Sequence, residues 1–189
     1  MKTWITSDLH LGHKKILEYC PISRPFETVE EMNSVIMNDW NSMIHPLDEV
    51  YILGDIAFYS GNDAANMLSL MHGKKYLVLG NHDKHLLKSE KFVKQFEWIK
   101  DYHTFKYNKK YIVLFHFPIA EWDRKHYNSV HLFGHLHNRK IDLKGKCKDV
   151  GLDTNFCKPY LLDNVLDELS SIEYNGMKEL KEYFGECDE

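Results

Sequence analysis

The sequence predicts a mixed α/β domain built from packed layers, and three observations support this prediction. Short apolar segments typical of strands alternate with longer amphipathic segments in the first half of the chain. Two later apolar segments have the spacing of a β-hairpin. With 43% hydrophobic and 13% aromatic residues, the chain can bury a substantial core. A length of 189 residues matches one domain, so we predict a single domain over residues 1–189.

Seven short segments that are rich in apolar residues predict strands. They cover residues 2–7, 49–53, 75–79, 104–107, 110–115, 129–133 and 150–153. The fourth and fifth segments flank Asn108-Lys109, a pair that suits the tight turn of a hairpin. The first three are separated by segments with helical spacing, which is the arrangement of a layered α/β domain.

Residues 28–44 carry the clearest helical pattern. Thr28 and Glu31 form a capping box, and apolar residues such as Met32 and Trp40 recur at helical spacing. We therefore expect a helix with one buried face in this segment. Further helices are expected over residues 63–72, 85–97, 161–169 and 177–184.

The charges are unevenly distributed along the chain. The net charge is −4, but residues 161–189 carry nine acidic and two basic side chains, a net charge of −7. We interpret this stretch as an acidic, solvated helical tail of the domain. Residues 1–160 are left with a net charge of +3, which does not repel a small phosphate. A protein that binds long nucleic acid usually has a marked basic face, so such a partner is not favoured.

Cysteine usage and hydropathy point to a cytoplasmic protein. The four cysteines are isolated and form no C-x-x-C pair, which fits a reducing compartment. The first residues contain no apolar run of signal-peptide length, and no later segment is long enough to span a membrane. We therefore expect no membrane partner, and the sequence sets no oligomeric state.

Polar side chains follow five of the predicted strands at the point where each strand ends. These residues are Asp8, Asp55, Asn81, His116 and His135. Ligands of α/β sheets bind at the carboxyl ends of the strands. Residues far apart in the sequence are therefore predicted to converge on one edge.

The polar residues at the strand ends have the chemistry of metal ligands. They are Asp8, His10, Asp55, Asn81, His82, His116, His135 and His137. Carboxylate, carboxamide and imidazole groups without a thiolate suit Mn, Fe, Zn or Ni. Eight such residues are too many for one tetrahedral ion and fit two ions that share a carboxylate.

Five short motifs carry a family resemblance. They are Asp8-x-His10, Gly54-Asp55, Gly80-Asn81-His82-Asp83, His116 and Gly134-His135-x-His137. In this order, and each after a predicted strand, they resemble the calcineurin-like metallophosphoesterase family. Residues 23–26 and 151–155 resemble stretches of a small bacterial and phage branch of this family. The resemblance implies a four-layer α/β/β/α sandwich with two mixed β-sheets and a dinuclear metal site at the strand ends.

The resemblance also implies a role for each motif residue. Asp8, His10 and His137 would bind the first metal ion. Asn81, His116 and His135 would bind the second ion, and Asp55 would bridge both. His82 would face the substrate as a general acid, with Asp83 behind it. Manganese is the expected metal, with Fe, Zn or Ni as alternatives.

These roles describe hydrolysis of a phosphate ester. A water molecule shared by two ions about 3.5–4 Å apart loses a proton near neutral pH, and the resulting hydroxide attacks phosphorus in line. Histidines titrate in the range needed to protonate the leaving alkoxide, which is the role of His82. Asp83 would orient His82 and keep it protonated, and it could also, or only, serve as a helix N-cap.

Three further residues are candidates for contact with the substrate. Arg24 is predicted to bind the phosphate with its forked donors, or else to lie on the surface. His13 is predicted to line the pocket, with a surface or supporting position as the alternative. Trp122 could stack on a base, although a core position is the commoner place for a tryptophan.

The sequence favours small phosphate esters, of nucleotide type, as substrates. The chain lacks large insertions that could hold a macromolecule, and it does not distinguish phosphodiesters from phosphomonoesters. One alternative is a nuclease that acts on DNA or RNA. A second alternative is a non-catalytic binding scaffold like the retromer subunit that resembles this family.

Overall fold

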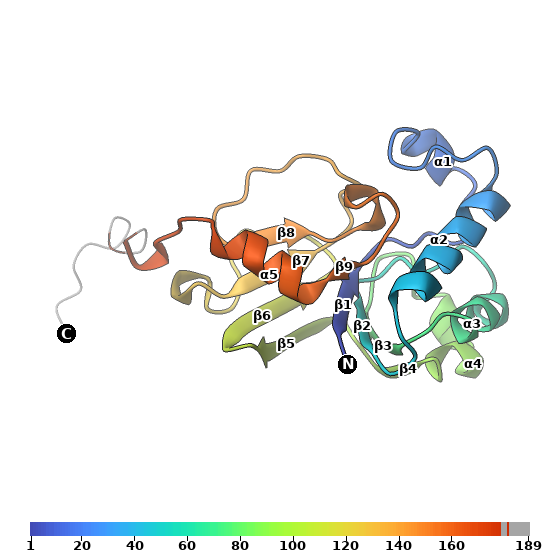
Figure 1. Cartoon of the computed structure of the whole chain (residues 1–189), viewed down its shortest axis with the longest axis horizontal. Helices are drawn as coiled ribbons and strands as arrows, with labels where there is room; N and C mark the ends of the chain where they lie inside the picture. The colour runs from blue at the N-terminus through green and yellow to red at the C-terminus, as the bar shows by residue number, and fades with distance from the viewer. Residues whose placement is uncertain (179–180, 182–189) are drawn as a thin grey trace.

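One β-sheet contains five strands and begins with the N-terminus of the chain. The computed structural model describes residues 1–178 and 181, and its element order is visible in Figure 1. The strand order is β4-β3-β2-β1-β9. The strands are β1 (Thr3–Thr6), β2 (Glu49–Ile52), β3 (Lys74–Val78), β4 (Phe96–Lys100) and β9 (Tyr160–Leu161). Strands β1 to β4 are parallel, whereas β9 pairs with β1 in the antiparallel direction.

The second sheet contains four strands in the order β5-β6-β7-β8. Its strands are β5 (Tyr102–Tyr107), β6 (Lys110–Phe115), β7 (Val130–Phe133) and β8 (Cys147–Asp149). β5 and β6 form the predicted antiparallel hairpin, and β6, β7 and β8 are parallel. Both sheets are therefore mixed, as predicted.

Helices cover the outer face of the first sheet. The α-helices with described bounds are α1 (Ile16–Tyr19), α2 (Val29–Met43), α3 (Gly61–Ser69), α4 (Glu90–Val93) and α5 (Leu162–Ser170). Met32, Ile36 and Trp40 on α2 join one buried cluster with Trp4 and Ile52 of the sheet. Thr28 caps α2 as predicted, because its side chain accepts a hydrogen bond from the N–H of Glu31. No helix within residues 1–178 is long and apolar enough to cross a membrane.

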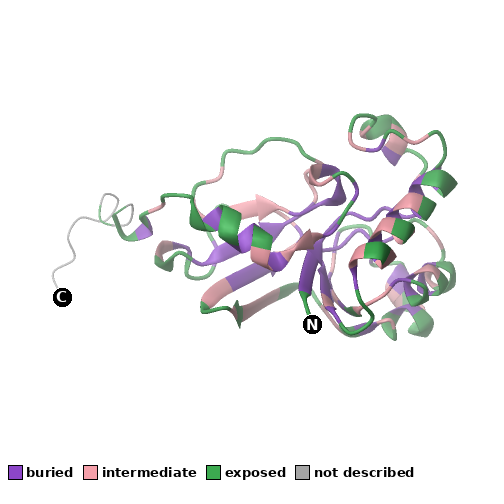
Figure 2. Ribbon diagram, in the orientation of Figure 1, coloured by how far each residue is buried: buried purple, intermediate pink, exposed green. Residues whose placement is uncertain are grey.

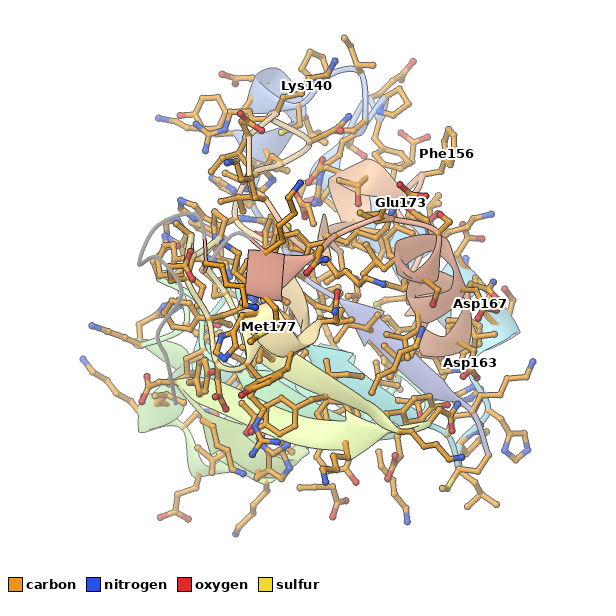
Figure 3. The ribbon with its side chains drawn as sticks, turned by 90° about the vertical axis from the view of Figure 1, so that its left-hand side faces the viewer. Lys140, Phe156, Asp163, Asp167, Glu173 and Met177 are labelled. Carbon is orange, nitrogen blue, oxygen red and sulfur yellow. The ribbon has the colours of Figure 1, made fainter. Side chains whose placement is uncertain are left out.

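A second buried cluster fills the space between the two sheets. Ile5 and Leu53 of the first sheet meet Leu114 and Leu132 of the second, and Val165 of α5 joins the same cluster. Figure 2 shows the strands of this region as largely buried. The acidic side of α5, with the labelled Asp163 and Asp167, faces outward in Figure 3. The predicted α/β sandwich with two mixed sheets is confirmed.

Trp122 and His131 pack together near the second sheet. Their ring centroids lie 5.3 Å apart. Trp122 is only 7% exposed, and its indole N–H donates to the hydroxyl of Ser129 at 3.0 Å. The prediction that Trp122 stacks on a substrate base is therefore wrong, because this ring is already enclosed by its neighbours.

Two predicted elements differ from the structure. Residues 85–97 do not form one helix, because Ser89 caps a new short helix by accepting from the N–H of Phe92, and β4 begins at Phe96. The expected strand over residues 150–153 lies earlier, as β8, and Gly151 makes only an isolated bridge to Ser7. The expected helix over 177–184 lies largely outside the described residues.

Burial of His131 makes the stability of the fold sensitive to acid. Its Nδ1–H donates to the carbonyl of Val113, and its Nε2 accepts from the N–H of Ile119, each at 3.3 Å. Burial lowers the pKa of His131 to about 4, below its value of about 6.5 in an unfolded chain. Between these values the unfolded state binds a proton that the folded state rejects, so stability decreases as the pH falls.

We expect His131 to lower the free energy of unfolding by up to about 3 kcal/mol as the pH falls from about 6.5 to about 4. Chemical denaturation at several pH values measures the free energy of unfolding of the wild type and of His131→Gln, whose side chain does not titrate. The variant should lose less stability over this range. Equal losses in both proteins would contradict the assignment.

Candidate metal centre

Strand ends deliver the candidate ligands to one edge of the structure. Asp8 follows β1, Asp55 follows β2, and His135 follows β7, and all three have left-handed backbone conformations with φ of 59°, 55° and 70°. Such conformations are unfavourable for residues other than glycine and are concentrated at functional sites. Hydrogen bonds hold them in place: the N–H of Asp8 donates to the carbonyl of Gly54 at 3.0 Å, and the N–H of His135 donates to Asp8 Oδ2 at 2.8 Å.

Asp8, His10 and His137 form the first cluster of candidate ligands. The Nε2 atoms of His10 and His137 lie 3.7 Å and 3.8 Å from Asp8 Oδ1. Asp8 Oδ1 and His10 Nε2 are buried and have no hydrogen-bond partner among the described residues. Buried polar atoms without a partner are rare, so these two atoms are free to bind a ligand between them.

Asp55, Asn81, His116 and His135 form the second cluster. Asn81 Oδ1 lies 2.9 Å from His116 Nε2 and 3.1 Å from His135 Nδ1. His116 donates its other ring N–H to the carbonyl of Leu53 at 2.6 Å. In a neutral imidazole this leaves Nε2 as an acceptor that faces the acceptor oxygen of Asn81, an arrangement that a shared cation satisfies.

Asp55 lies between the two clusters. Its Oδ2 is 3.6 Å from His10 Nε2 of the first cluster and 3.7 Å from His116 Nε2 of the second. Its Oδ1 accepts the backbone N–H of His82 at 2.9 Å, which fixes the carboxylate. One carboxylate therefore faces both clusters.

Divalent ions fit these two clusters on distance and donor type. Ligand atoms that each lie about 2.0–2.2 Å from one ion are about 3 to 4 Å from one another. The separations of 3.6–3.8 Å between the donors agree with that spacing and are too long for hydrogen bonds. Nitrogen and oxygen donors without thiolates suit borderline transition metals.

Burial also prepares two of the imidazoles to act as ligands. It lowers the pKa of His10, where it outweighs the attraction of the Asp8 carboxylate. Burial, together with the nearby His116, likewise lowers the pKa of His135. A metal binds the neutral imidazole, so these shifts keep both side chains in the form that binds.

The family of the chain follows from its sequence matches. The model of the calcineurin-like phosphoesterases matches residues 1–123, which is more than half of the chain. The chain belongs to the calcineurin-like phosphoesterase family. Membership assigns phosphoester hydrolysis as its class of reaction and implies divalent metal ions.

Two sequence relatives come from an archaeon and a phage, and one solved structure shares the fold. An uncharacterized protein of Methanocaldococcus jannaschii is 30% identical over 173 residues, covering 87% of this chain and 89% of the relative. The gene 66 protein of Mycobacterium phage L5 is 42% identical over 84 residues, or 43% of this chain and 39% of the phage protein. A crystal structure of a protein of unknown function from Aquifex aeolicus has the same fold, with a TM-score of 0.70, 24% identity, and coverage of 89% and 98%.

His82 lies at the mouth of the phosphoesterase site. Its side chain is 45% exposed, and its Nε2 is 4.0 Å from Asp55 Oδ2. This position leaves the imidazole open to solvent and beside the carboxylate that faces both clusters. The predicted place of His82 next to the substrate is compatible with this geometry.

Asp83 does not support the His82 ring. Its carboxylate accepts three backbone N–H groups at 2.8–2.9 Å, from Asp55, Ile56 and Gly80, and within the described part of the chain it makes no hydrogen bond to the imidazole. The predicted pairing of Asp83 with His82 is therefore wrong, and its side chain does not cap a helix either. Asp83 instead ties the loop after β3 to the loop after β2, which carries Asp55.

Arg24 is buried behind the site and does not reach the substrate. The residue is 1% exposed, and its guanidinium pairs with both oxygens of Asp153 at 2.9 Å. The predictions of a phosphate contact and of a surface position are both wrong. Asp153, which the sequence reasoning did not select, also accepts the Nδ1–H of His137 at 2.8 Å.

His13 lies at the rim of the site, against an aromatic residue that the sequence reasoning missed. The rings of His13 and Phe58 are stacked with centroids 3.7 Å apart and planes inclined by 7°. Phe58 is 36% exposed and also contacts the ring of His82 at 4.9 Å. Its position shortly after the Gly54-Asp55 motif is the signal that could have identified it.

Gly134 is required by the close approach of β7 to β1. A Cβ atom at this position would collide with the Ser7 hydroxyl and with Asp8 Oδ2. We expect Gly134→Ala to displace Asp8, to reduce the bound metal, and to destabilise the protein by about 1–3 kcal/mol. Metal content and thermal melting measure the two effects.

Gly61→Ala is the matched control for Gly134→Ala. Gly61 is the first residue of α3 and lies outside both ligand clusters. A Cβ atom there would collide with the side chain of Ser89. The control should retain its metal. If Gly134→Ala binds metal as well as the wild type does, the tight contact between β7 and β1 is not needed for the site.

Proposed function

We propose that this chain hydrolyses small phosphate esters with the help of two divalent transition-metal ions. Asp8, His10 and His137 hold the first ion in this proposal. Asn81, His116 and His135 hold the second, and Asp55 bridges them. The observation that carries the proposal is the position of Asp55 Oδ2, at 3.6 Å and 3.7 Å from ligand atoms of the two clusters.

The electrostatics of the site favour an anionic substrate. The first cluster contributes one carboxylate, Asp8, and Asp55 contributes the other, so two divalent ions leave about two positive charges. Asp8 and Asp55 are both buried, which weakens solvent screening of these charges. A phosphate ester would therefore be attracted to the exposed side of the site, where His82 lies.

Each part of the chemistry has a group to supply it. When bound, paired ions of this kind lower the pKa of a water molecule to near neutrality and polarise phosphoryl oxygens. His82 is exposed beside Asp55 and supplies a proton to the departing alkoxide oxygen. The Asp83 carboxylate accepts backbone N–H groups from the loops after β2 and β3 and holds these loops together, so Asp55 and His82 keep their relative position.

The rim of the site favours esters that carry a planar group. His13 and Phe58 present a stacked pair of rings beside His82, and an exposed aromatic ring can contact a nucleobase. This supports nucleotide-type substrates, while the nitrogen and oxygen donors of the two clusters support manganese or a similar metal. The convergence of all seven candidate ligands with His82 favours an enzyme over a binding scaffold. The net charge of only +3 on residues 1–160 gives little support to the nuclease alternative.

Replacing the shared carboxylate should strongly reduce activity. We expect the metal-stripped protein to hydrolyse bis-p-nitrophenyl phosphate only after Mn²⁺ is added, and Asp55→Asn to reduce kcat by at least about 100-fold, because it weakens both clusters. If the protein hydrolyses neither this diester nor p-nitrophenyl phosphate at any Mn²⁺ concentration, the proposal is contradicted.

The role of His82 should depend on the leaving group. His82→Ala should reduce kcat on an alkyl ester by about 10²–10⁴-fold but should act less on p-nitrophenyl esters, whose leaving group scarcely needs a proton. His45→Ala, at an exposed histidine outside both clusters, serves as the control. Equal losses on alkyl and nitrophenyl esters would argue against a general acid at this position.

Phe58 should affect the binding of planar esters. We expect Phe58→Leu to raise KM roughly tenfold for aryl and nucleotide esters and to leave KM for alkyl esters nearly unchanged. Phe156→Leu is the control, because Phe156 is 88% exposed and is labelled at the edge of the molecule in Figure 3. A similar change in KM for both kinds of ester would show that the ring stack does not select the leaving group.

A further inference from the structure

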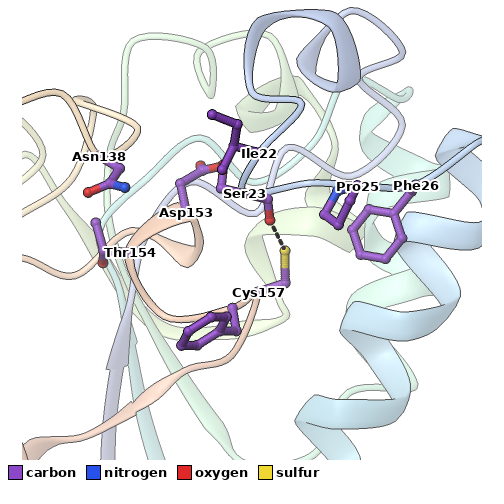
Figure 4. A pocket seen from close by; sticks show the side chains of 9 residues that line it. Ile22, Ser23, Pro25, Phe26, Asn138, Asp153, Thr154 and Cys157 are labelled. Atoms are coloured by element: carbon purple, nitrogen blue, oxygen red, sulfur yellow. Dashed lines mark hydrogen bonds between the residues drawn. The ribbon is translucent and has the colours of Figure 1, made fainter.

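A buried ion pair lies directly behind the first ligand cluster. The side chains of Arg24 and Asp153 are fully shielded from solvent, and Arg24 Nη2 lies 2.9 Å from Asp153 Oδ2. Arg24 Nε donates to Asp153 Oδ1 at the same distance, so the pair is bidentate. The hydroxyl of Ser23 also donates to Asp153 Oδ1, at 2.6 Å. Ser23 and Asp153 are among the residues that line the pocket in Figure 4.

The carboxylate of this pair fixes one candidate ligand. Asp153 Oδ2 accepts the Nδ1–H of His137 at 2.8 Å. This hydrogen bond sets the tautomer of the imidazole and directs its Nε2 towards Asp8 Oδ1, at 3.8 Å. Asp153 therefore acts on the metal site through His137 and does not face the site itself.

The guanidinium of the pair fixes the backbone that carries the other two ligands. Arg24 Nη2 donates to the carbonyl of Asp8 at 2.6 Å, and Arg24 Nη1 donates to the carbonyl of Leu9 at 3.0 Å. These carbonyls lie within a turn in which Asp8 and His10 have left-handed backbones. Arg24 thus donates four hydrogen bonds, two to Asp153 and one each to the carbonyls of Asp8 and Leu9. The last two hold the backbone that positions Asp8 and His10.

The second cluster is held by different contacts. Asp83 accepts the N–H groups of Asp55 and Ile56, and His116 donates its Nδ1–H to Leu53. None of the hydrogen bonds of Arg24 or Asp153 in residues 1–178 goes to this cluster. The clusters also touch directly, because the N–H of His135 donates to Asp8 Oδ2 at 2.8 Å. The Arg24–Asp153 pair, however, supports only residues of the first cluster.

We propose that Arg24 and Asp153 are positioning residues dedicated to the first metal ion. The inference rests on the proposed two-metal function and adds that one buried ion pair sets the affinity of one ion and not of the other. Loss of the pair should leave a protein that binds a single ion in the second cluster. A pair that served only to stabilise the fold would instead reduce the binding of both ions together, or of neither.

The test compares metal binding in metal-stripped full-length protein titrated with Mn²⁺. Elemental analysis after dialysis counts the bound ions, and electron paramagnetic resonance distinguishes two coupled ions from one isolated ion. We expect the wild type to bind two coupled ions. We expect Asp153→Asn to bind one ion with the spectrum of an isolated Mn²⁺, and the affinity for the other ion to fall by about 10–100-fold.

Asp48→Asn is the matched control because Asp48 is also a buried carboxylate with several hydrogen bonds. It accepts from the N–H of Lys2, from the indole of Trp4 and from the N–H of His45, none of which belongs to a ligand cluster. We expect this control to lose thermal stability and still bind two coupled ions. Loss of one ion in the control as well would assign the effect to general destabilisation and overturn the proposal.

A second variant covers the case in which Asp153→Asn does not fold. Removing one partner leaves a buried unpaired charge, whereas Arg24→Met combined with Asp153→Leu removes both charges and keeps the site filled. This double variant should also bind one ion. Two coupled ions with wild-type affinity, in either variant, would overturn the proposal. If the wild type does not bind two metal ions, the proposed function itself is contradicted. The titration of the wild type distinguishes this outcome from a failure of the positioning role.

Discussion

The structure depends on the close approach of strand ends from two different sheets. Gly134 lies against Asp8. A Cβ atom added at Gly54 would lie 2.3 Å from the backbone N of Gly80 and 2.9 Å from His116 Nδ1. Only glycine allows the backbones to come this near. The approach brings Asp8 and Asp55 from the first sheet within reach of His116 and His135 from the second, and the inter-sheet core around Leu53 and Leu114 maintains it.

This arrangement is costly for an isolated protein chain. A left-handed backbone costs on the order of 1–3 kcal/mol at each of five residues, Asp8, His10, Asp55, His135 and His137. In addition, the buried atoms Asp8 Oδ1 and His10 Nε2 have no hydrogen-bond partner among the described residues. Buried hydrogen bonds that Asp83 and Asp153 accept and that Arg24 donates offset part of this cost. Part of the free energy of folding therefore maintains a strained site whose shape is complementary to bound ions.

The family and the convergence of the motifs could be predicted from the sequence because they rest on local signals. Each motif follows an apolar strand directly, so its residue types and order suffice. Arg24 and Trp122 could not be placed, because their environments depend on contacts far along the chain. The partner of Arg24 is Asp153, 129 residues away, and the Trp122 ring is enclosed by packing near the second sheet. The helix expected over residues 85–97 failed for a similar reason, because pairing with β3 selects a strand from Phe96.

The central claim is that Asp55 is shared by two metal ions. A crystal structure of the protein grown with Mn²⁺, with anomalous scattering recorded at the manganese edge, tests it most directly. We predict two peaks about 3.5–4 Å apart, with Asp55 between them, Asp8, His10 and His137 around one, and Asn81, His116 and His135 around the other. A single peak, or two peaks that do not share Asp55, would contradict the account.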